Sequence, residues 1–526
     1  MRHAARGFVL AACAAALAGC FDFGGLKPKG DAGVRDADES DGADSEVSVP
    51  CAEKTYACDD DELVTTCVDG SKAPTRETCA LGCDASAKVC GALVPGFVNE
   101  EHRDWAVLGE YELIVTSTFT LNTETGTLTQ DGEDDIALEF ELEDQDEGAP
   151  KLAVFRLGRL EVTDGARLQF VGKHAVALVV RGEVVINGTI DVSADEATGG
   201  PGGASGDVAD GALAEWPLNG AGTRDLIVAD RALAAPGGGG GSNGAPGGSG
   251  GDARATGYQE NPLAPGGVGP RTASADGGSP GAAFADTADW AGSLVGGGAG
   301  GPASCGQGTG DDLGVRGGGG GGALLVSASG GLILGTDAVL IASGAGGRAR
   351  KDYVFKTEGN PISPCSAYGG SGGGGGAGGT VVLESRTVSF LGGVFANGGG
   401  GGGGATSEGG MTSKVGSDGL PEAGPAAGGA GSVGGAAIDR AGTGAAGGAA
   451  GAHEGLSPPE TEAGYVNGNV EPRARAYAGG GGGGVGRIVI RVLPDADLPE
   501  VGTFSPSEAP ALSASQDAAT FTPTRP

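Results

Sequence analysis

Cysteine is the residue type in this sequence with the clearest chemical roles, and Cys20 has the most specific surroundings. Arg2 and Arg6 precede an apolar run over residues 8–17, and an alanine and a glycine stand immediately before Cys20. A basic start, a short apolar run and small residues at the cleavage point are typical of a lipoprotein signal peptide, and the run is too short to span a bilayer. We therefore expect cleavage before Cys20 and its acylation by palmitate-like chains, which would anchor the mature chain in a membrane. The alternative is a chance cysteine behind a plain apolar segment.

Eight of the ten cysteines remain once Cys13 leaves with the signal peptide and Cys20 is acylated. An even number of cysteines in an exported chain predicts disulfides, although the sequence leaves their connectivity open. A zinc site is the alternative, but the sequence has no Cys-x-x-Cys and no histidine near the clustered cysteines. The disulfide candidates are a cluster of six and a distant pair: Cys51, Cys58, Cys67, Cys79, Cys83 and Cys90, with Cys305 and Cys365.

No spacing of residues predicts a catalytic site, a metal site or a bound cofactor. His102, His174 and His453 are far apart, so a zinc hydrolase or a Ser-His-Asp site would depend on long-range folding. Gly172 and Lys173 lack the preceding glycine of a phosphate-binding loop. The acidic residues Asp131, Glu133, Asp134 and Asp135 could bind calcium through carboxylate oxygens, but a solvated loop is the simpler interpretation.

Composition excludes two classes of protein. The formal charge is −34, from 33 basic and 67 acidic side chains. Nucleic-acid binding needs a basic patch that neutralises phosphates, and the sequence has none. Glycine accounts for 112 of 526 residues, but it comes in runs and not at every third position, which excludes a collagen helix.

Shifts in composition divide the chain into six parts. We assign residues 1–19 to a lipoprotein signal peptide, 20–50 to an acidic disordered tether, and 51–90 to a six-cysteine disulfide module. Residues 91–194 form a β region, 195–493 form a glycine-rich repeat region, and 494–526 form a disordered tail rich in Pro, Ser and Ala.

Alternating apolar and polar residues predict short strands within the β region. We expect them at residues 111–121, 152–162, 168–171, 175–180 and 184–192. A further strand is predicted at 136–142, where Ile136, Leu138, Phe140 and Leu142 would form the buried face.

An internal repeat gives the predicted fold class. Apolar segments that start at Ala177, Ala323, Thr380 and Arg487 can be aligned when the sequence is divided at its glycine runs. Units with two or three short strands cannot bury an apolar face alone, so neighbouring units must stack. We therefore predict an all-β fold, a right-handed parallel β-solenoid or β-helix with long glycine-rich insertions on one side. A β-sandwich with unusually long loops is the alternative.

The glycine runs at 237–241, 317–322, 372–376, 398–404 and 479–484 have two interpretations. Flexible coil is one, because glycine loses more backbone entropy on ordering than other residues do. The other is lateral packing of extended glycine helices with three residues per turn, which could exchange backbone hydrogen bonds because no side chains hold them apart. We expect order where a run adjoins a repeat strand.

The chain resembles the glycine-rich surface lipoproteins of the myxobacterial type. The resemblance rests on residues 17–20, on the spacing of Cys79 and Cys83, on the strands 154–162 and 184–192, and on the alternation of glycine runs with strands. The chain is similar to PE-PGRS proteins in composition only, because the amino-terminal domain of that family is absent. The resemblance implies a surface component and carries over no catalytic residue.

The leading functional hypothesis is a cell-envelope lipoprotein with a structural or surface-interaction role and no enzymatic activity. Phe21 after Cys20 favours the outer membrane, with the protein on its periplasmic or extracellular face. One alternative is an adhesin-like module for polysaccharides or cell-surface ligands, which needs Trp216, Trp290 or Tyr368 in a groove. The third hypothesis is a polysaccharide lyase or hydrolase, which needs a carboxylate cluster on one face.

Overall fold

The computed structural model describes a chain whose regular elements are all β-strands within the described ranges. These ranges are 54–59, 62–67, 74–78, 83–84, 89–90, 97–98, 111–130, 135–206, 218–220, 227–229, 232–258, 270–283, 292–304, 314–349, 369–406, 413–431, 439–449, 454–463, 465–466, 469–470, 474–492 and 502–506. Within them no helix is long and apolar enough to cross a membrane.

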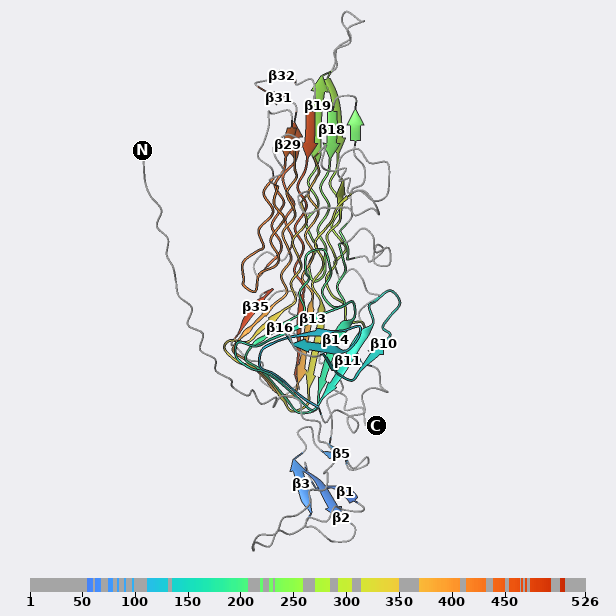
Figure 1. Cartoon of the computed structure of the whole chain (residues 1–526), viewed down its shortest axis with the longest axis vertical. Helices are drawn as coiled ribbons and strands as arrows, with labels where there is room; N and C mark the ends of the chain where they lie inside the picture. The colour runs from blue at the N-terminus through green and yellow to red at the C-terminus, as the bar shows by residue number, and fades with distance from the viewer. Residues whose placement is uncertain are drawn as a thin grey trace, which may run out of the picture.

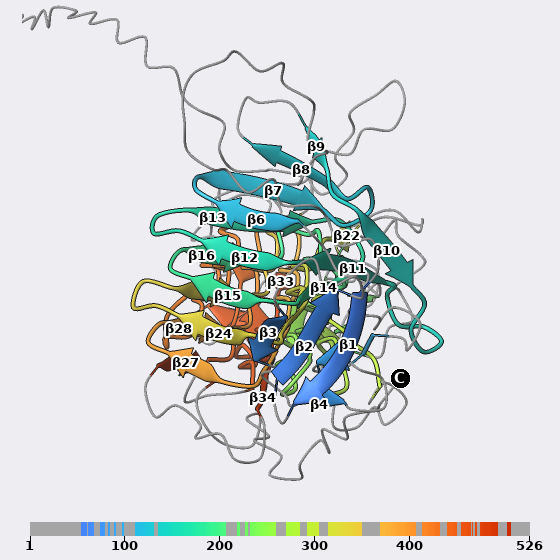
Figure 2. The ribbon, with the colours of Figure 1, turned by 90° about the horizontal axis from the view of Figure 1, so that it is seen from below.

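Three sheets lie together in the lower half of the molecule as Figure 1 shows it, and we call them the base (Figures 1 and 2). The first sheet contains, in order, β10 (Phe140–Glu143), β11 (Leu152–Leu157), β14 (Ala175–Val180), β23 (Ala323–Ala328), β26 (Thr380–Ser385) and β34 (Arg487–Arg491). The second contains β27 (Val388–Phe390), β24 (Gly331–Leu334), β15 (Glu183–Ile186), β12 (Arg159–Val162) and β6 (Glu112–Val115). The third contains β35 (Thr503–Ser505), β28 (Gly393–Phe395), β25 (Val339–Ile341), β16 (Thr189–Asp191), β13 (Arg167–Val171), β7 (Thr118–Asn122), β8 (Thr127–Gln130) and β9 (Ile136–Ala137).

The main core lies between these three sheets. Each strand points alternate side chains inward, as in β15, where Val184 and Ile186 are buried and Glu183 is exposed. The parallel register then stacks equivalent apolar residues along the base, so that Val184 lies between Leu160 and Leu332. Burial of one such side chain contributes about 1.5–3 kcal/mol to stability. Neither a single strand nor a single repeat could bury its apolar face alone, so the strands must stack.

The repeat aligned from the sequence is confirmed in three of its four units. Ala323 pairs with Thr380, and Thr380 pairs with Arg487, as the alignment predicts. The first unit is shifted by two residues, because Ala177 pairs with Leu325 and not with Ala323. A two-residue shift keeps every side chain on its face, so the apolar pattern alone does not detect it.

The strands predicted from alternation are confirmed, except at 136–142. There β9 and β10 are separate short strands, Ile136 and Leu142 are exposed, and Glu143 is buried. Both strands pair antiparallel at an edge of the base, where Phe140 stacks on Phe155 with ring centroids 5.4 Å apart. Leu138 and Glu139 belong to neither strand, so the chain does not continue as one alternating strand, and the simple alternation over 136–142 is wrong.

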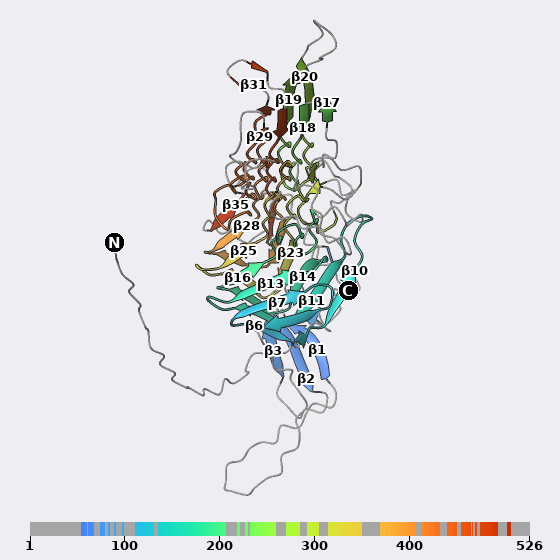
Figure 3. The same cartoon turned by 45° about the horizontal axis from the view of Figure 1, so that its top comes forward.

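A second group of sheets lies at the opposite, distal end (Figures 1 and 3). One sheet contains β17 (Ile227–Ala229), β18 (Ala232–Ala235), β33 (Ala474–Tyr477) and β29 (Asp439–Ala441), and the other contains β20 (Pro270–Ala275), β19 (Ala253–Tyr258) and β30 (Thr461–Ala463). The cluster between them consists entirely of buried alanines, which include Ala234, Ala255 and Ala476. A methyl-only core lets the two sheets approach closely.

Shorter sheets complete the described strands. β21 (Ala303–Ser304) pairs with β22 (Gly314–Val315), and β31 (Tyr465–Val466) pairs with β32 (Asn469–Val470). In the cysteine-rich part, β1 (Lys54–Asp59), β2 (Glu62–Cys67) and β3 (Thr75–Thr78) form an antiparallel sheet, and β4 (Cys83–Asp84) pairs with β5 (Val89–Cys90).

The predicted right-handed parallel β-solenoid is wrong. The described strands belong to nine separate sheets, in which parallel and antiparallel pairs are mixed, and none of the sheets closes on itself. The physical reason lies in the glycine-rich segments between the repeats, which neither add coils to the base nor leave it as loops. They form a body of their own between the base and the distal sheets.

Candidate functional site

The middle of the molecule is a bundle of extended glycine-rich segments that run along its long axis (Figures 1 and 3). We call it the glycine bundle. Its segments continue directly from strands at either end: residues 316–322 lead into β23, and residues 478–486 connect β33 to β34. Along the chain, strands therefore form where side chains can pack, and extended glycine segments connect one strand to the next.

Residues 370–379 form the centre of the bundle, and we call them the central run. They exchange backbone hydrogen bonds with six other segments. These neighbours are residues 236–243, 294–301, 316–322, 342–348, 396–405 and 478–486. Six hydrogen-bonded neighbours around one chain make a three-dimensional array, whereas a strand in a sheet has two neighbours.

The hydrogen bonds of the central run repeat every third residue. The amides of Gly372, Gly375 and Gly378 donate to residues 478, 481 and 484 at 2.8–3.0 Å. Gly373 and Gly376 donate to a second neighbour, residues 348 and 345, at 3.1 and 2.9 Å. An extended helix with three residues per turn has no internal hydrogen bonds and points successive amides in three directions. The predicted lateral packing of glycine helices is therefore confirmed, and ten residues span about 30 Å at 3.1 Å per residue.

Close packing explains why these segments are glycine. A Cβ added at any glycine from Gly372 to Gly379 would lie 1.8–2.1 Å from a carbonyl oxygen of a neighbouring segment. Real Cβ atoms do not approach another atom to less than 3.0 Å. At these glycine positions the hydrogen-bonded spacing leaves no room for a side chain, whereas the buried Ala377 of the same run shows that one methyl group is accommodated where the neighbouring segments leave space.

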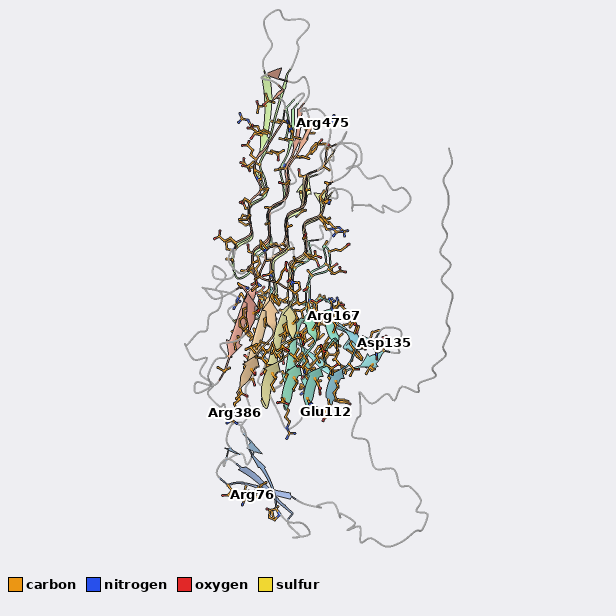
Figure 4. The ribbon with its side chains drawn as sticks, turned by 90° about the vertical axis from the view of Figure 1, so that its left-hand side faces the viewer. Arg76, Glu112, Asp135, Arg167, Arg386 and Arg475 are labelled. Atoms are coloured by element: carbon orange, nitrogen blue, oxygen red, sulfur yellow. The ribbon has the colours of Figure 1, made fainter. Side chains whose placement is uncertain are left out.

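Many side chains of the bundle lie on its outside, although some, such as those of Asn243 and Ala377, are buried within it (Figure 4). Ser249, Ser279, Ser417 and Ala430 are exposed, whereas the glycines beside them are buried. These outward residues stand where one more glycine chain would otherwise pack. They therefore end the array and give the bundle a surface of small side chains.

Buried amide side chains hold the bundle to the base. Asn397 donates from Nδ2 to the carbonyl oxygens of Leu420 and Glu422 at 2.7 and 2.8 Å, and its Oδ1 accepts from the hydroxyl of Ser505 at 2.5 Å. Asn243 donates to the carbonyl of Gly378 at 2.9 Å. Sequence reasoning missed both residues, although Asn397 lies one residue beyond the end of β28 and immediately before a glycine run.

In two ion pairs of the base the carboxylate is almost fully buried. Arg491 donates to Glu384 at 2.6 Å, and the Glu384 side chain is 1% exposed. Arg167 pairs with Asp191, whose side chain is also buried. Burial, and to a smaller extent repulsion from Arg491, lower the pKa of Arg487 to about 10. These pairs connect neighbouring strands, β26 with β34 and β13 with β16.

His174 is the histidine that the structure describes. It is buried, and its backbone amide donates to the Thr123 hydroxyl at 3.3 Å. Burial lowers its pKa below the usual 6.5, and the nearby Lys173 lowers it further while Glu124 acts in the opposite direction. The described residues contain no group of three or more His, Cys, Asp or Glu side chains placed to hold a metal ion.

Many of the residues singled out from the sequence lie outside the described ranges. Among the predicted acidic ligands Asp135 is described, and its carboxylate accepts from the Thr129 hydroxyl at 2.7 Å. Among the cysteines, Cys83 and Cys90 are register partners on β4 and β5, and Cys58 and Cys67 lie on β1 and β2. The residues outside are Cys20, Cys51, Cys79, Cys305, Cys365, His102, His453, Asp131, Glu133, Asp134, Trp216, Trp290 and Tyr368.

Comparisons with known proteins do not assign a family. No family model matches the chain, and no curated protein and no solved structure matches it. The most distinctive feature of the described residues is the glycine bundle, an extended array held together by backbone hydrogen bonds.

Proposed function

We propose that this chain is a lipid-anchored envelope protein in which the glycine bundle acts as a rigid spacer. The anchor is Cys20, and the spacer holds the distal sheets away from the membrane. This is a structural or surface-interaction role without catalysis, on the outer membrane of the cell envelope. The sequence around Cys20 supports the anchor, and the hydrogen-bonded array supports the spacer.

The observation that carries the proposal is the six-neighbour hydrogen bonding of the central run. Ordering glycine is costly, because glycine loses more backbone freedom than any other residue. Ordered glycine is not needed merely to connect two sheets, because flexible glycine linkers can connect them without losing this backbone freedom. Satisfying each amide laterally gives a body that resists bending, which is what a spacer needs.

The anchor is tested by Cys20→Ser, with Cys13→Ser as the matched control in the same signal segment. Cells that express each variant are labelled with palmitate and separated into membrane and soluble fractions. We expect Cys20→Ser to lose the label and leave the membrane fraction, and Cys13→Ser to behave like the unmodified chain. Retention of label and membrane association by Cys20→Ser would contradict the proposal.

The spacer is tested by small-angle scattering on the purified chain that begins at residue 51, which lacks the predicted acidic tether. We expect the distance distribution of an elongated particle that is unchanged between low and high ionic strength. A rigid array satisfies its amides internally, whereas a flexible acidic chain contracts when salt screens its charge. A salt-dependent, coil-like distribution would contradict a rigid spacer.

A further inference from the structure

The chain makes one defined contact with the base between the cysteine-rich strands and β6. Phe97 and Val98 lie against the outer face of the first base sheet, beside Val382 and Val489. Val98 is 1% exposed. This outer cluster is separate from the main core and extends across the first base sheet from β11 to β34.

Arg491 of β34 contacts the ring of Phe97. Its guanidinium carbon lies 5.0 Å from the centroid of the Phe97 ring, and the same guanidinium donates to Glu384 at 2.6 Å. The buried carboxylate fixes the plane of the guanidinium, which keeps it available to the ring face. A cation and an aromatic ring at this distance attract each other, more strongly where water is excluded.

The backbone at Phe97 is strained. Its φ is +66°, a left-handed conformation that is rare for a bulky residue. Such strain persists only where surrounding contacts stabilise it, and it is therefore a pointer to function. The ring contact with Arg491 and the burial of Val98 are those contacts.

We propose that Phe97 and Val98 form a latch that carries load from the anchored cysteine-rich part directly to β34. This inference rests on the proposed anchored role. β34 continues from residues 478–486, which hydrogen-bond to the central run, so load at the latch passes into the middle of the bundle. Without the latch, the same load reaches β6, an edge strand that pairs only with β12 among the described strands.

The latch is tested by pulling single molecules of the chain that begins at residue 21, held by its N-terminus and by a thiol introduced with Ser274→Cys on the exposed side of β20. We expect Phe97→Ala to shorten the lifetime of the first unfolding event about tenfold at constant force. Arg491→Lys keeps a positive charge beside Glu384 but loses the planar contact with the ring, and it should shorten the lifetime in the same direction.

Tyr111→Ala is the matched control, because Tyr111 is an exposed aromatic residue immediately before β6. We expect it to leave the lifetime unchanged. Equal lifetimes for the unmodified chain, Phe97→Ala and Tyr111→Ala would overturn the latch, provided that circular dichroism shows all three to be folded. This result is independent of the Cys20 test, since the purified chain carries no lipid, and a soluble, unanchored protein could still show the latch.

Discussion

Gly376 lies in the middle of the central run, and Gly376→Ala tests whether the hydrogen-bonded array holds the molecule together. The added Cβ would lie 1.9 Å from the carbonyl oxygen of Gly319 and 2.9 Å from that of Gly318. Both are backbone atoms, so the strain cannot be relieved by rotating a side chain. To reach 3.0 Å, the central run and residues 316–322 would have to separate by about 1.1 Å.

That separation would break the bonds from Gly318 to Gly374 and from Gly321 to Ala377, which are 2.8 and 2.9 Å long. Each buried group left without a partner costs about 1–3 kcal/mol, and overpacking typically costs about 1–3 kcal/mol. We therefore expect Gly376→Ala to lower the free energy of unfolding by about 3 kcal/mol or more. The measurement is denaturant unfolding followed by circular dichroism.

Gly424→Ala is the matched control, because its nearest neighbour beyond the adjacent residues is the flexible Glu422 side chain at 3.6 Å and its φ is not left-handed. There the substitution should be neutral or stabilising by about 0.4–1 kcal/mol, through reduced freedom of the unfolded chain. Equal effects of the two substitutions would refute the reasoning. If Gly376→Ala does not fold, hydrogen exchange of the unmodified chain tests the array instead. We expect the amides of the central run to exchange far more slowly than those of an unstructured peptide.

Three further predictions concern buried polar groups. Glu384→Gln should lower the free energy of unfolding by about 3–5 kcal/mol in a denaturation experiment, because it leaves the Arg491 charge without its buried carboxylate. Asn397→Ala should lower it by about 2–4 kcal/mol in the same assay, since it leaves two carbonyl oxygens and the Ser505 hydroxyl without their partner. His174 should make the protein less stable as the pH falls below 6.5. Burial lowers the pKa of His174 in the folded state, so the unfolded state binds more protons in this pH range. Thermal unfolding of His174→Gln should lack this pH dependence.

Each of these predictions has a control. Glu139→Gln removes an exposed carboxylate and should change stability by less than about 0.5 kcal/mol. Asn122→Ala removes an amide that makes a local bond to the Glu124 amide in an exposed turn, and its cost should be under about 1 kcal/mol. For His174 the control is the unmodified chain well above pH 6.5, where neutral histidine is the stable form in both states and the stability curves of the two proteins should run parallel.

Sequence reasoning predicted the individual strands of the base well and their overall arrangement poorly. Alternation marks a half-buried strand because successive side chains point to opposite faces, and β15 shows this directly, with buried Val184 and Ile186 beside exposed Glu183. At β10, where Leu142 is exposed and Glu143 buried, the pattern misled because the chain leaves the strand conformation at residues 138–139 and β10 begins as a separate strand. The β-solenoid hypothesis failed for a related reason, since it treated the segments between repeats as loops.

By itself, the sequence determined where strands form, which of their faces are buried, and that the long runs between them carry no side chains. Only the tertiary structure decided which chains lie together. Gly238 donates to Gly372 and Gly481 donates to Gly238, although these residues are far apart in the sequence. Glycine has no side chain to specify a neighbour, so any run could pair with any other by local pattern alone. The partners are chosen instead by the strands at the two ends, whose side chains fix the position of each run and so decide which amides and carbonyls meet.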